Sequence, residues 1–201
     1  MLGLCASLCA EPKSSSICLT ANVTAGAGNE GGETYFQDGL SLWIGYVDPT
    51  NPDAVTPSLG TKYTDDELTD LPTDNSPITV ELYGSGEETF DIYVAAQTNN
   101  IEKQETMVSF SLEEGKKGWQ HSTDTTQTVS IGFRADGYQK NGSGLYCNAD
   151  GNTLTVTALE NTKTDMPIYI GKASAVWEKS TEYQAGTWKA NIIVTITPGN
   201  A

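Results

Sequence analysis

The end of the chain carries the sequence pattern that most constrains the fold. Every second position there is apolar, and most positions between are polar; the apolar ones are Trp188, Ala190, Ile192, Val194 and Ile196. Alternation with a period of two predicts a β-strand with one buried face. Gly186 precedes this segment, and Pro198 ends it. Such a strand must lie in a sheet whose apolar face packs against a second layer.

The same pattern recurs along the chain, with turn-forming residues between the segments. Runs rich in Val, Ile, Thr, Tyr and Phe predict further strands at 17–24, 40–47, 78–83, 89–96, 107–112, 129–135, 154–159 and 166–177. No segment shows the periodicity of an amphipathic helix. The sequence therefore predicts an all-β fold. Short strands with unequal connections favour an immunoglobulin-like sandwich over a closed barrel.

Composition divides the 201 residues into three parts. Residues 1–10 are small and apolar and resemble the end of a secretory signal, with Ala10 at the cleavage position. Residues 11–32 hold the strand at 17–24 and a Gly-rich linker. Residues 33–201 are predicted to form one sandwich domain, in which the proline-rich stretch 48–77 is mostly loop with at most one short strand or helical turn. No other stretch approaches about 18 apolar residues, so we expect export without membrane insertion.

The net charge and the sequence motifs argue against several classes of function. The chain has a net charge of −15, which argues against nucleic-acid binding because a phosphate backbone requires clustered Lys and Arg. His121 is the single histidine and is interpreted as an exposed loop residue, and no serine lies in a nucleophile motif. We therefore expect no enzymatic activity and no cofactor. Acidic loops at 48–53 and 70–74 offer oxygen ligands for calcium; solvation is the alternative, since the EF-hand spacing is absent.

Two cysteines remain once a signal is removed. Cys18 and Cys147 form a candidate disulfide, as expected for a lone pair in an exported protein. A metal site is disfavoured because ligands are lacking, so we expect none.

The four tryptophans divide into two groups. Trp43, Trp177 and Trp188 lie within apolar alternation and are expected in the core. Trp119 follows a Gly-Lys-Lys-Gly turn and is the candidate for facing a ligand.

The two ends of the chain resemble a family of secreted proteins. Gly186-x-Trp188 followed by alternating apolar residues is similar to the last strand of fimbrial subunits assembled by the chaperone–usher route. The alternating segment 16–25, followed by a loose linker, resembles the donor strand of the colonisation-factor type of these pilins. The resemblance covers the layout of the chain and matches motifs at its two ends.

The resemblance implies an immunoglobulin-like sandwich that lacks one strand and is completed by donor-strand exchange. The donor residues would be Ile17, Leu19, Ala21 and Val23. The groove and the chaperone-binding edge would be formed by Gly186, Trp188, Ala190, Ile192, Val194 and Ile196. Partners would be other copies, a periplasmic chaperone, an outer-membrane usher and a host-surface receptor. The protein would pass through the periplasm to the cell surface.

Two alternatives remain open. A disulfide between Cys18 and Cys147 would tether the donor segment to its own domain, or would instead crosslink neighbouring subunits. The chain could also be a surface adhesin or a carbohydrate-binding sandwich that is complete in itself.

Overall fold

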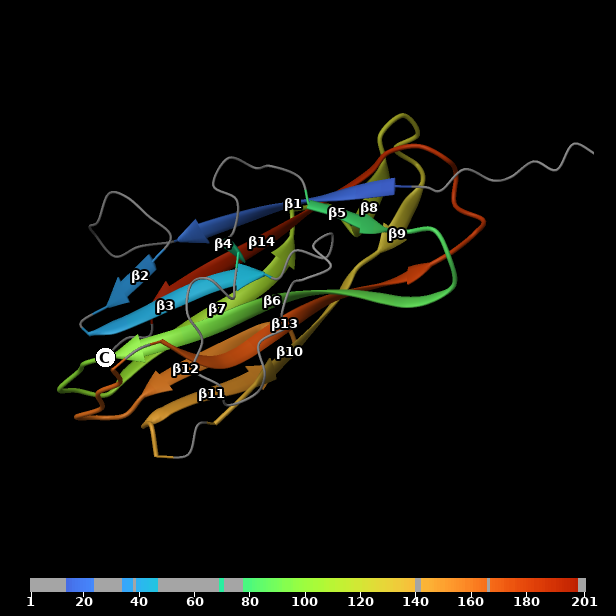
Figure 1. Ribbon diagram of the computed structural model, residues 1–201. Helices are drawn as coiled ribbons and strands as arrows, with labels where there is room; N and C mark the ends of the chain where they lie inside the picture. The colour runs from blue at the N-terminus through green and yellow to red at the C-terminus, as the bar shows by residue number, and fades with distance from the viewer. Residues whose placement is uncertain are drawn as a thin grey trace, which may run out of the picture.

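The structure is a computed structural model that describes residues 14–23, 34–37, 39–46, 69–70, 78–139, 142–165 and 167–198. No helix is found in these segments (Figure 1). The strands are β1 (Ser14–Val23), β2 (Thr34–Gln37), β3 (Leu40–Tyr46), β4 (Thr69–Asp70), β5 (Ile78–Glu81), β6 (Gly86–Thr98), β7 (Gln104–Leu112), β8 (Gly118–His121), β9 (Thr128–Ser130), β10 (Gly132–Gly137), β11 (Leu145–Asp150), β12 (Thr153–Ala158), β13 (Ile168–Lys179) and β14 (Trp188–Pro198). The expected all-β sandwich is confirmed.

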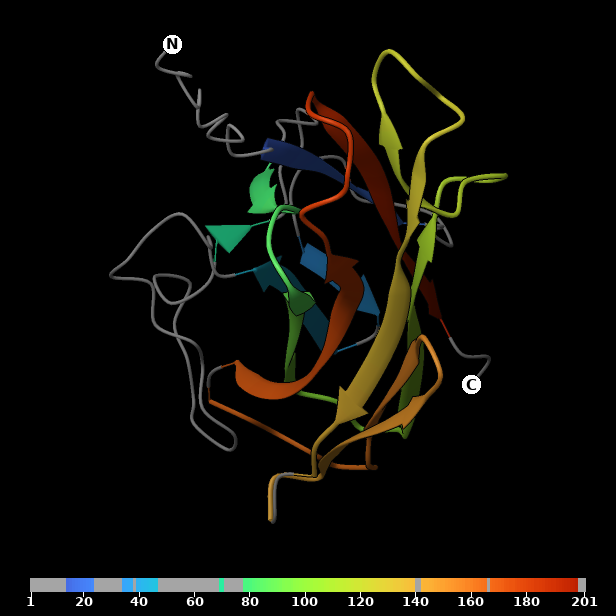
Figure 2. The same ribbon diagram turned by 90° about the vertical axis from the view of Figure 1, so that its right-hand side faces the viewer.

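The strands form two sheets that enclose one main core. The first sheet has the order β11-β12-β7-β14-β1-β5, and β8 joins it by pairing with β14 and β9. The second sheet has the order β10-β13-β6-β3-β2, with β4 beside β3. The long strand β13 is strongly curved (Figure 2). Every described pair is antiparallel except β1 with β14.

The two sheets are joined where β10 leads into β11. Gln139 and Tyr146 form an isolated bridge, and the Cys147 N–H donates to the Tyr138 carbonyl at 3.1 Å. The Ala135 N–H donates to the Gly151 carbonyl at 3.0 Å. This side of the sandwich is therefore closed by backbone hydrogen bonds, and β1 and β5 lie at the other end of the first sheet.

Each strand predicted from alternation is present, within a few residues at its ends. The exception is the run predicted at 129–135, which is two strands, β9 and β10. The prediction missed β2, β8 and β11. β2 and β8 have four residues each, which leaves few positions in which a period of two can stand out.

The candidate disulfide between Cys18 and Cys147 is wrong, because Cys147 is a buried free thiol. The sheet order gives the reason. Cys18 lies on β1 opposite Asn191 of β14, whereas Cys147 lies on β11, and β12, β7 and β14 separate the two strands. Four strand spacings amount to about 19 Å. A disulfide requires Cα atoms roughly 4.4–6.8 Å apart.

Candidate functional site

The candidate site is built around β14, whose alternating face is buried as predicted. Trp188 is 1% exposed and Ile192 and Val194 are 0% exposed. Ala190 and Ile196 belong to the same core cluster. The positions between them are exposed or partly exposed. The sequence pattern therefore identified both the strand and the face that it buries.

The start of β14 is fixed by aromatic and backbone contacts. The Trp188 Nε1–H donates to the Gln184 carbonyl at 3.1 Å. Its ring meets His121 edge-on, with centroids 5.1 Å apart, and lies 5.8 Å from the ring of Tyr183. These contacts hold the end of β14 at which β1 also begins.

His121 is buried, so its interpretation as an exposed loop residue is wrong. Its side chain is 2% exposed and lies at the end of β8, opposite Trp188. The Asp124 N–H donates to Nδ1 at 3.1 Å, so Nδ1 carries no proton. Nε2 is 3.2 Å from the Ala185 carbonyl and therefore donates to it. His121 thus connects β8 to the turn that precedes β14, a role that its polar neighbours in sequence did not indicate.

Gly186 provides the space for this histidine. A Cβ atom at residue 186 would lie 2.2 Å from His121 Nε2. The backbone at Gly186 has φ = 143°, a value that side chains rarely tolerate. The glycine singled out by the sequence pattern is therefore required by a close approach between two segments.

The segment predicted to be the donor strand pairs within its own chain. β1 runs parallel to β14 from Ser15 opposite Trp188 to Val23 opposite Ile196. On its other side, Ser14–Ile17 pairs with β5. The register places Ile17, Leu19, Ala21 and Val23 opposite the core-facing residues Ala190, Ile192, Val194 and Ile196. The two ends of the chain that carry the resemblance are thus neighbours in one sheet.

Trp119 is not exposed, so its assignment as a ligand-facing residue is wrong. It is 0% exposed and packs edge-on against Trp177, with ring centroids 5.3 Å apart. Its Nε1 is buried without a hydrogen-bond acceptor among the described atoms. The Gly-Lys-Lys-Gly turn suggested exposure, but β8 begins at Gly118 and directs the next side chain into the core. Trp177 and Trp188 are core residues, as predicted.

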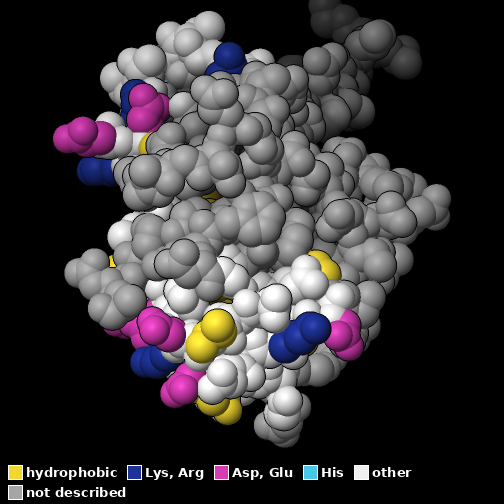
Figure 3. Space-filling view, turned by 90° about the vertical axis from the view of Figure 1, so that its left-hand side faces the viewer, with side chains coloured by type: hydrophobic (Ala, Val, Ile, Leu, Met, Phe, Trp, Pro, Cys, Tyr) yellow, Lys and Arg dark blue, Asp and Glu magenta, His cyan; other side chains and the backbone are white. Residues whose placement is uncertain are grey.

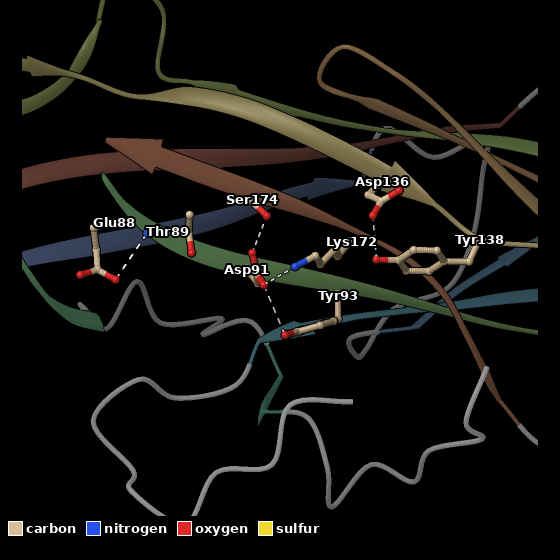
Figure 4. Close-up of polar contacts among 8 residues, drawn as sticks. All are labelled: Glu88, Thr89, Asp91, Tyr93, Asp136, Tyr138, Lys172 and Ser174. Carbon is tan, nitrogen blue, oxygen red and sulfur yellow. Dashed lines mark hydrogen bonds and ion pairs between the residues drawn. The ribbon is translucent and has the colours of Figure 1, made fainter. Parts of the chain in front are cut away.

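A second group of polar side chains lies on the outer face of the other sheet (Figure 4). Asp91 of β6 receives hydrogen bonds from Lys172 Nζ at 2.6 Å and from the Ser174 hydroxyl, both on β13. The Tyr93 hydroxyl lies 3.5 Å from the same carboxylate. Ser174 is directly opposite Asp91 in the ladder. Sequence reasoning missed this group because cross-strand partners depend on register.

The neighbouring tyrosines are packed together. Tyr93, Tyr138 and Tyr169 form a cluster in which ring centroids lie 5.2–5.5 Å apart. Burial raises the pKa of Tyr169 and that of Tyr138 above the usual value of a tyrosine. Because the Asp91 carboxylate is paired with an ammonium group and these two phenols stay neutral, this arrangement suits cross-strand stabilisation rather than proton transfer.

One end of the molecule exposes large apolar side chains. Ile101 is 78% exposed and Leu159 is 41% exposed, on the connections that follow β6 and β12. Figure 3 faces this end and shows hydrophobic side chains beside basic and acidic ones. The Asn161 N–H donates to the Ile101 carbonyl at 3.2 Å, so the two connections are joined.

Several candidates lie outside the described residues or their described side chains. They are the side chains of the donor segment, Trp43, the acidic loops at 48–53 and 70–74, and Cys18. Among the described segments, no group of three or more His, Cys, Asp or Glu residues could hold a metal ion. The same segments contain no helix long and apolar enough to cross a membrane.

Two comparisons with known proteins found no match. No protein-family model matches the chain, and no curated protein matches its sequence. The functional argument therefore depends on the residues and the geometry described above.

Proposed function

We propose that this protein is an exported structural subunit of a bacterial surface fimbria that polymerises by exchanging β1 between copies and supports adhesion. The observation that carries the proposal is the place of β1. Over nine residues it pairs with β14, the strand that resembles the groove strand of such subunits. Its neighbour on the other side is β5, over four residues. The proposed role is structural and requires neither catalysis nor a cofactor.

The pairing of β1 supports exchange for a physical reason. Its pairing with β14 and β5 uses backbone groups, so any copy of the same segment could form the same pairs. β1 is N-terminal to the rest of the fold, and a Gly-rich sequence at 24–33 connects it to β2. Swapping an identical terminal element between copies is a low-cost route to assembly. The parallel direction of β1 and β14 would be kept in the exchanged form.

A subunit without β1 would need protection. Removing β1 exposes nine positions along the edge of β14 and leaves β5 without its partner among the described strands. An open, apolar edge of this length promotes aggregation. A periplasmic chaperone would cover this edge, an outer-membrane usher would assemble the fibre, and a host-surface receptor would be the target of the mature fimbria.

A self-contained surface adhesin or carbohydrate-binding module is the second candidate. One observation favours it: β1 pairs with β14 and β5 of its own chain, which completes the sheet without a second copy. The two candidates differ in whether β1 ever leaves this position.

A disulfide trap tests the exchange directly. Asn191 lies opposite Cys18 in the β1–β14 ladder, so Asn191→Cys places two cysteines in facing positions of adjacent strands. The variant, lacking residues 1–10, is concentrated under reducing conditions and then oxidised. Exchange of β1 would give a ladder of disulfide-linked multimers on a non-reducing gel. Crosslinking within single chains alone, at every protein concentration, would refute polymerisation by β1 and favour the self-contained module.

Thr195→Cys is the matched control. Thr195 lies on the same strand, on the same partly exposed face, but opposite Asn22, so no disulfide with β1 can form. A ladder in this control would show that the multimers arise from random oxidation. A chain lacking residues 11–28 gives a second test. This shortened chain should aggregate, and a peptide of residues 14–23 should restore its stability. If the shortened chain is stable without the peptide, β14 does not form an open groove that needs a donor strand.

A further inference from the structure

Near its start, β14 changes its neighbouring strand on one side from β8 to β7. β14 pairs with β8 through Lys189, opposite Gln120, and with β7 from Ile192, opposite Leu112. Between these points the chain leaves β7 in the turn 113–117. Glu113 stays close to β14, because its N–H donates to the Asn191 carbonyl at 3.4 Å and its carboxylate accepts from Asn191 Nδ2 at 2.9 Å. The change of partner leaves a hollow on the outer surface of the sheet.

The hollow has a volume of about 260 Å³ and is lined by both polar and apolar atoms. Its walls include Lys116, Gln120, Ser122, Thr125, Lys189 and Asn191, and buried His121 also contributes. Pockets for drug-sized ligands begin at roughly 300 Å³, so this one fits a smaller molecule, of the size of a single sugar residue.

Local hydrogen bonds hold the lining in place. Lys116 Nζ donates to Gln120 Oε1 at 3.1 Å, and Gln120 Nε2 donates to the Thr125 carbonyl at 2.9 Å. The Ser122 hydroxyl donates to the Thr187 carbonyl at 2.8 Å and keeps its oxygen lone pairs for accepting. The polar groups are therefore arranged before a ligand arrives, which lowers the cost of binding.

The two lysines of the hollow form no ion pair among the described residues. Eight Lys and Arg residues lie in the described segments, and four of them form ion pairs: Lys103, Arg134, Lys172 and Lys179. Neither Lys116 nor Lys189 has a described carboxylate oxygen within 4.0 Å. Two unpaired ammonium groups at one hollow are therefore available to an anion, although the chain carries a net charge of −15.

We propose that the hollow between β7, β8 and β14 binds a carboxylated sugar, such as a uronic or sialic acid residue at the end of a glycan. Lys116 and Lys189 would hold the carboxylate. Gln120, Ser122 and Thr125 would bind hydroxyl groups of the ring, and the Glu113 carboxylate would accept from a hydroxyl on the opposite side. The neutral hydrogen-bonding groups favour a sugar over a simple anion, because an anion without hydroxyl groups would leave them unbound. The site does not include β1, so this proposal stands or fails separately from strand exchange.

Titration of the intact protein with matched sugars tests the proposal. Sodium glucuronate and glucose share a ring and differ in the carboxylate, and binding of each is followed by calorimetry at low and at physiological salt. Glucuronate or N-acetylneuraminate should bind at least about tenfold more tightly than glucose, because a hydrogen bond to a charged group contributes roughly that much. Added salt should weaken the binding of the acidic sugars, since the lysines are exposed.

Charge-matched variants identify the site. Lys116→Gln and Lys189→Gln should each reduce glucuronate affinity by about fivefold to tenfold. Lys163→Gln is the control, because Lys163 is exposed, lacks a described ion pair and lies beyond the other end of the strands, bridged to Asn99. Equal loss in this control, equal affinity for glucose and glucuronate, or no binding of either sugar would overturn the proposal. Tighter binding of a hexaglutamate peptide than of any acidic sugar would overturn the choice of ligand class.

Discussion

The contact between Gly186 and His121 gives the sharpest test of how β14 is held. In Gly186→Ala, the new Cβ would lie 2.2 Å from His121 Nε2, so the imidazole must move. The backbone strain of an alanine at φ = 143° costs about 1–2 kcal/mol. Displacing His121 weakens the hydrogen bonds from the Asp124 N–H and to the Ala185 carbonyl, at about 1 kcal/mol each. We expect a loss of about 3–4 kcal/mol in the free energy of unfolding.

The Gly115→Ala variant distinguishes the cost of backbone strain from the cost of the steric clash with His121. Gly115 also has a positive φ, 78°, but nothing lies within 4 Å of a Cβ built there. It should lose only the strain, about 1–2 kcal/mol. Unfolding in urea, followed by tryptophan fluorescence, measures both variants. For a chain of this size the difference between them corresponds to a shift in Tm of about 4–8 °C.

A double-mutant cycle decides the cause. In a His121→Ala background the imidazole is absent, so Gly186→Ala should cost no more than the strain. The coupling energy between the two sites should therefore be about 2 kcal/mol. A coupling near zero, or equal losses for Gly186→Ala and Gly115→Ala, would refute the argument that the glycine is needed to admit the histidine.

Three further predictions concern the core and the outer face. Burial raises the pKa of the Cys147 thiol from 9.0 to about 12, so peptide mapping should find it unlabelled by a thiol reagent at pH 8 until the protein unfolds. The thiol ionises at a lower pH in the unfolded protein than in the folded one, so the free energy of unfolding should fall as pH rises from about 9 to 12. Cys147→Ala should abolish this fall. Trp188→Phe should cost about 1 kcal/mol more than Trp119→Phe in urea unfolding, since only the Trp188 indole loses a hydrogen bond; equal costs would contradict this. Asp91→Asn should destabilise by about 1–2 kcal/mol, whereas Glu105→Gln, from an exposed ion pair, should change stability by less than about 0.5 kcal/mol; similar values would refute the role of the partly buried network.

Local alternation predicted much of the fold, because a period of two depends only on neighbouring residues. The apolar positions of β14 are buried as expected, and each long strand lies within a few residues of its predicted run. The same reasoning failed for β8, whose four residues follow a turn that resembles an exposed loop. As a result, Trp119 and His121 were both assigned to the surface, although β8 buries them.

The sequence by itself determined that this chain folds into an all-β sandwich and which face of its last strand is buried. Only the tertiary structure decided what lies beside that strand. The parallel pairing of β1 with β14, the separation of Cys18 from the strand that carries Cys147, and the approach of Gly186 to His121 all depend on sheet order. Sheet order is set by contacts between residues far apart in the chain, and alternation along one strand carries no information about its neighbour. The hollow beside Lys189 has the same origin, since it exists only because β14 changes partner from β8 to β7.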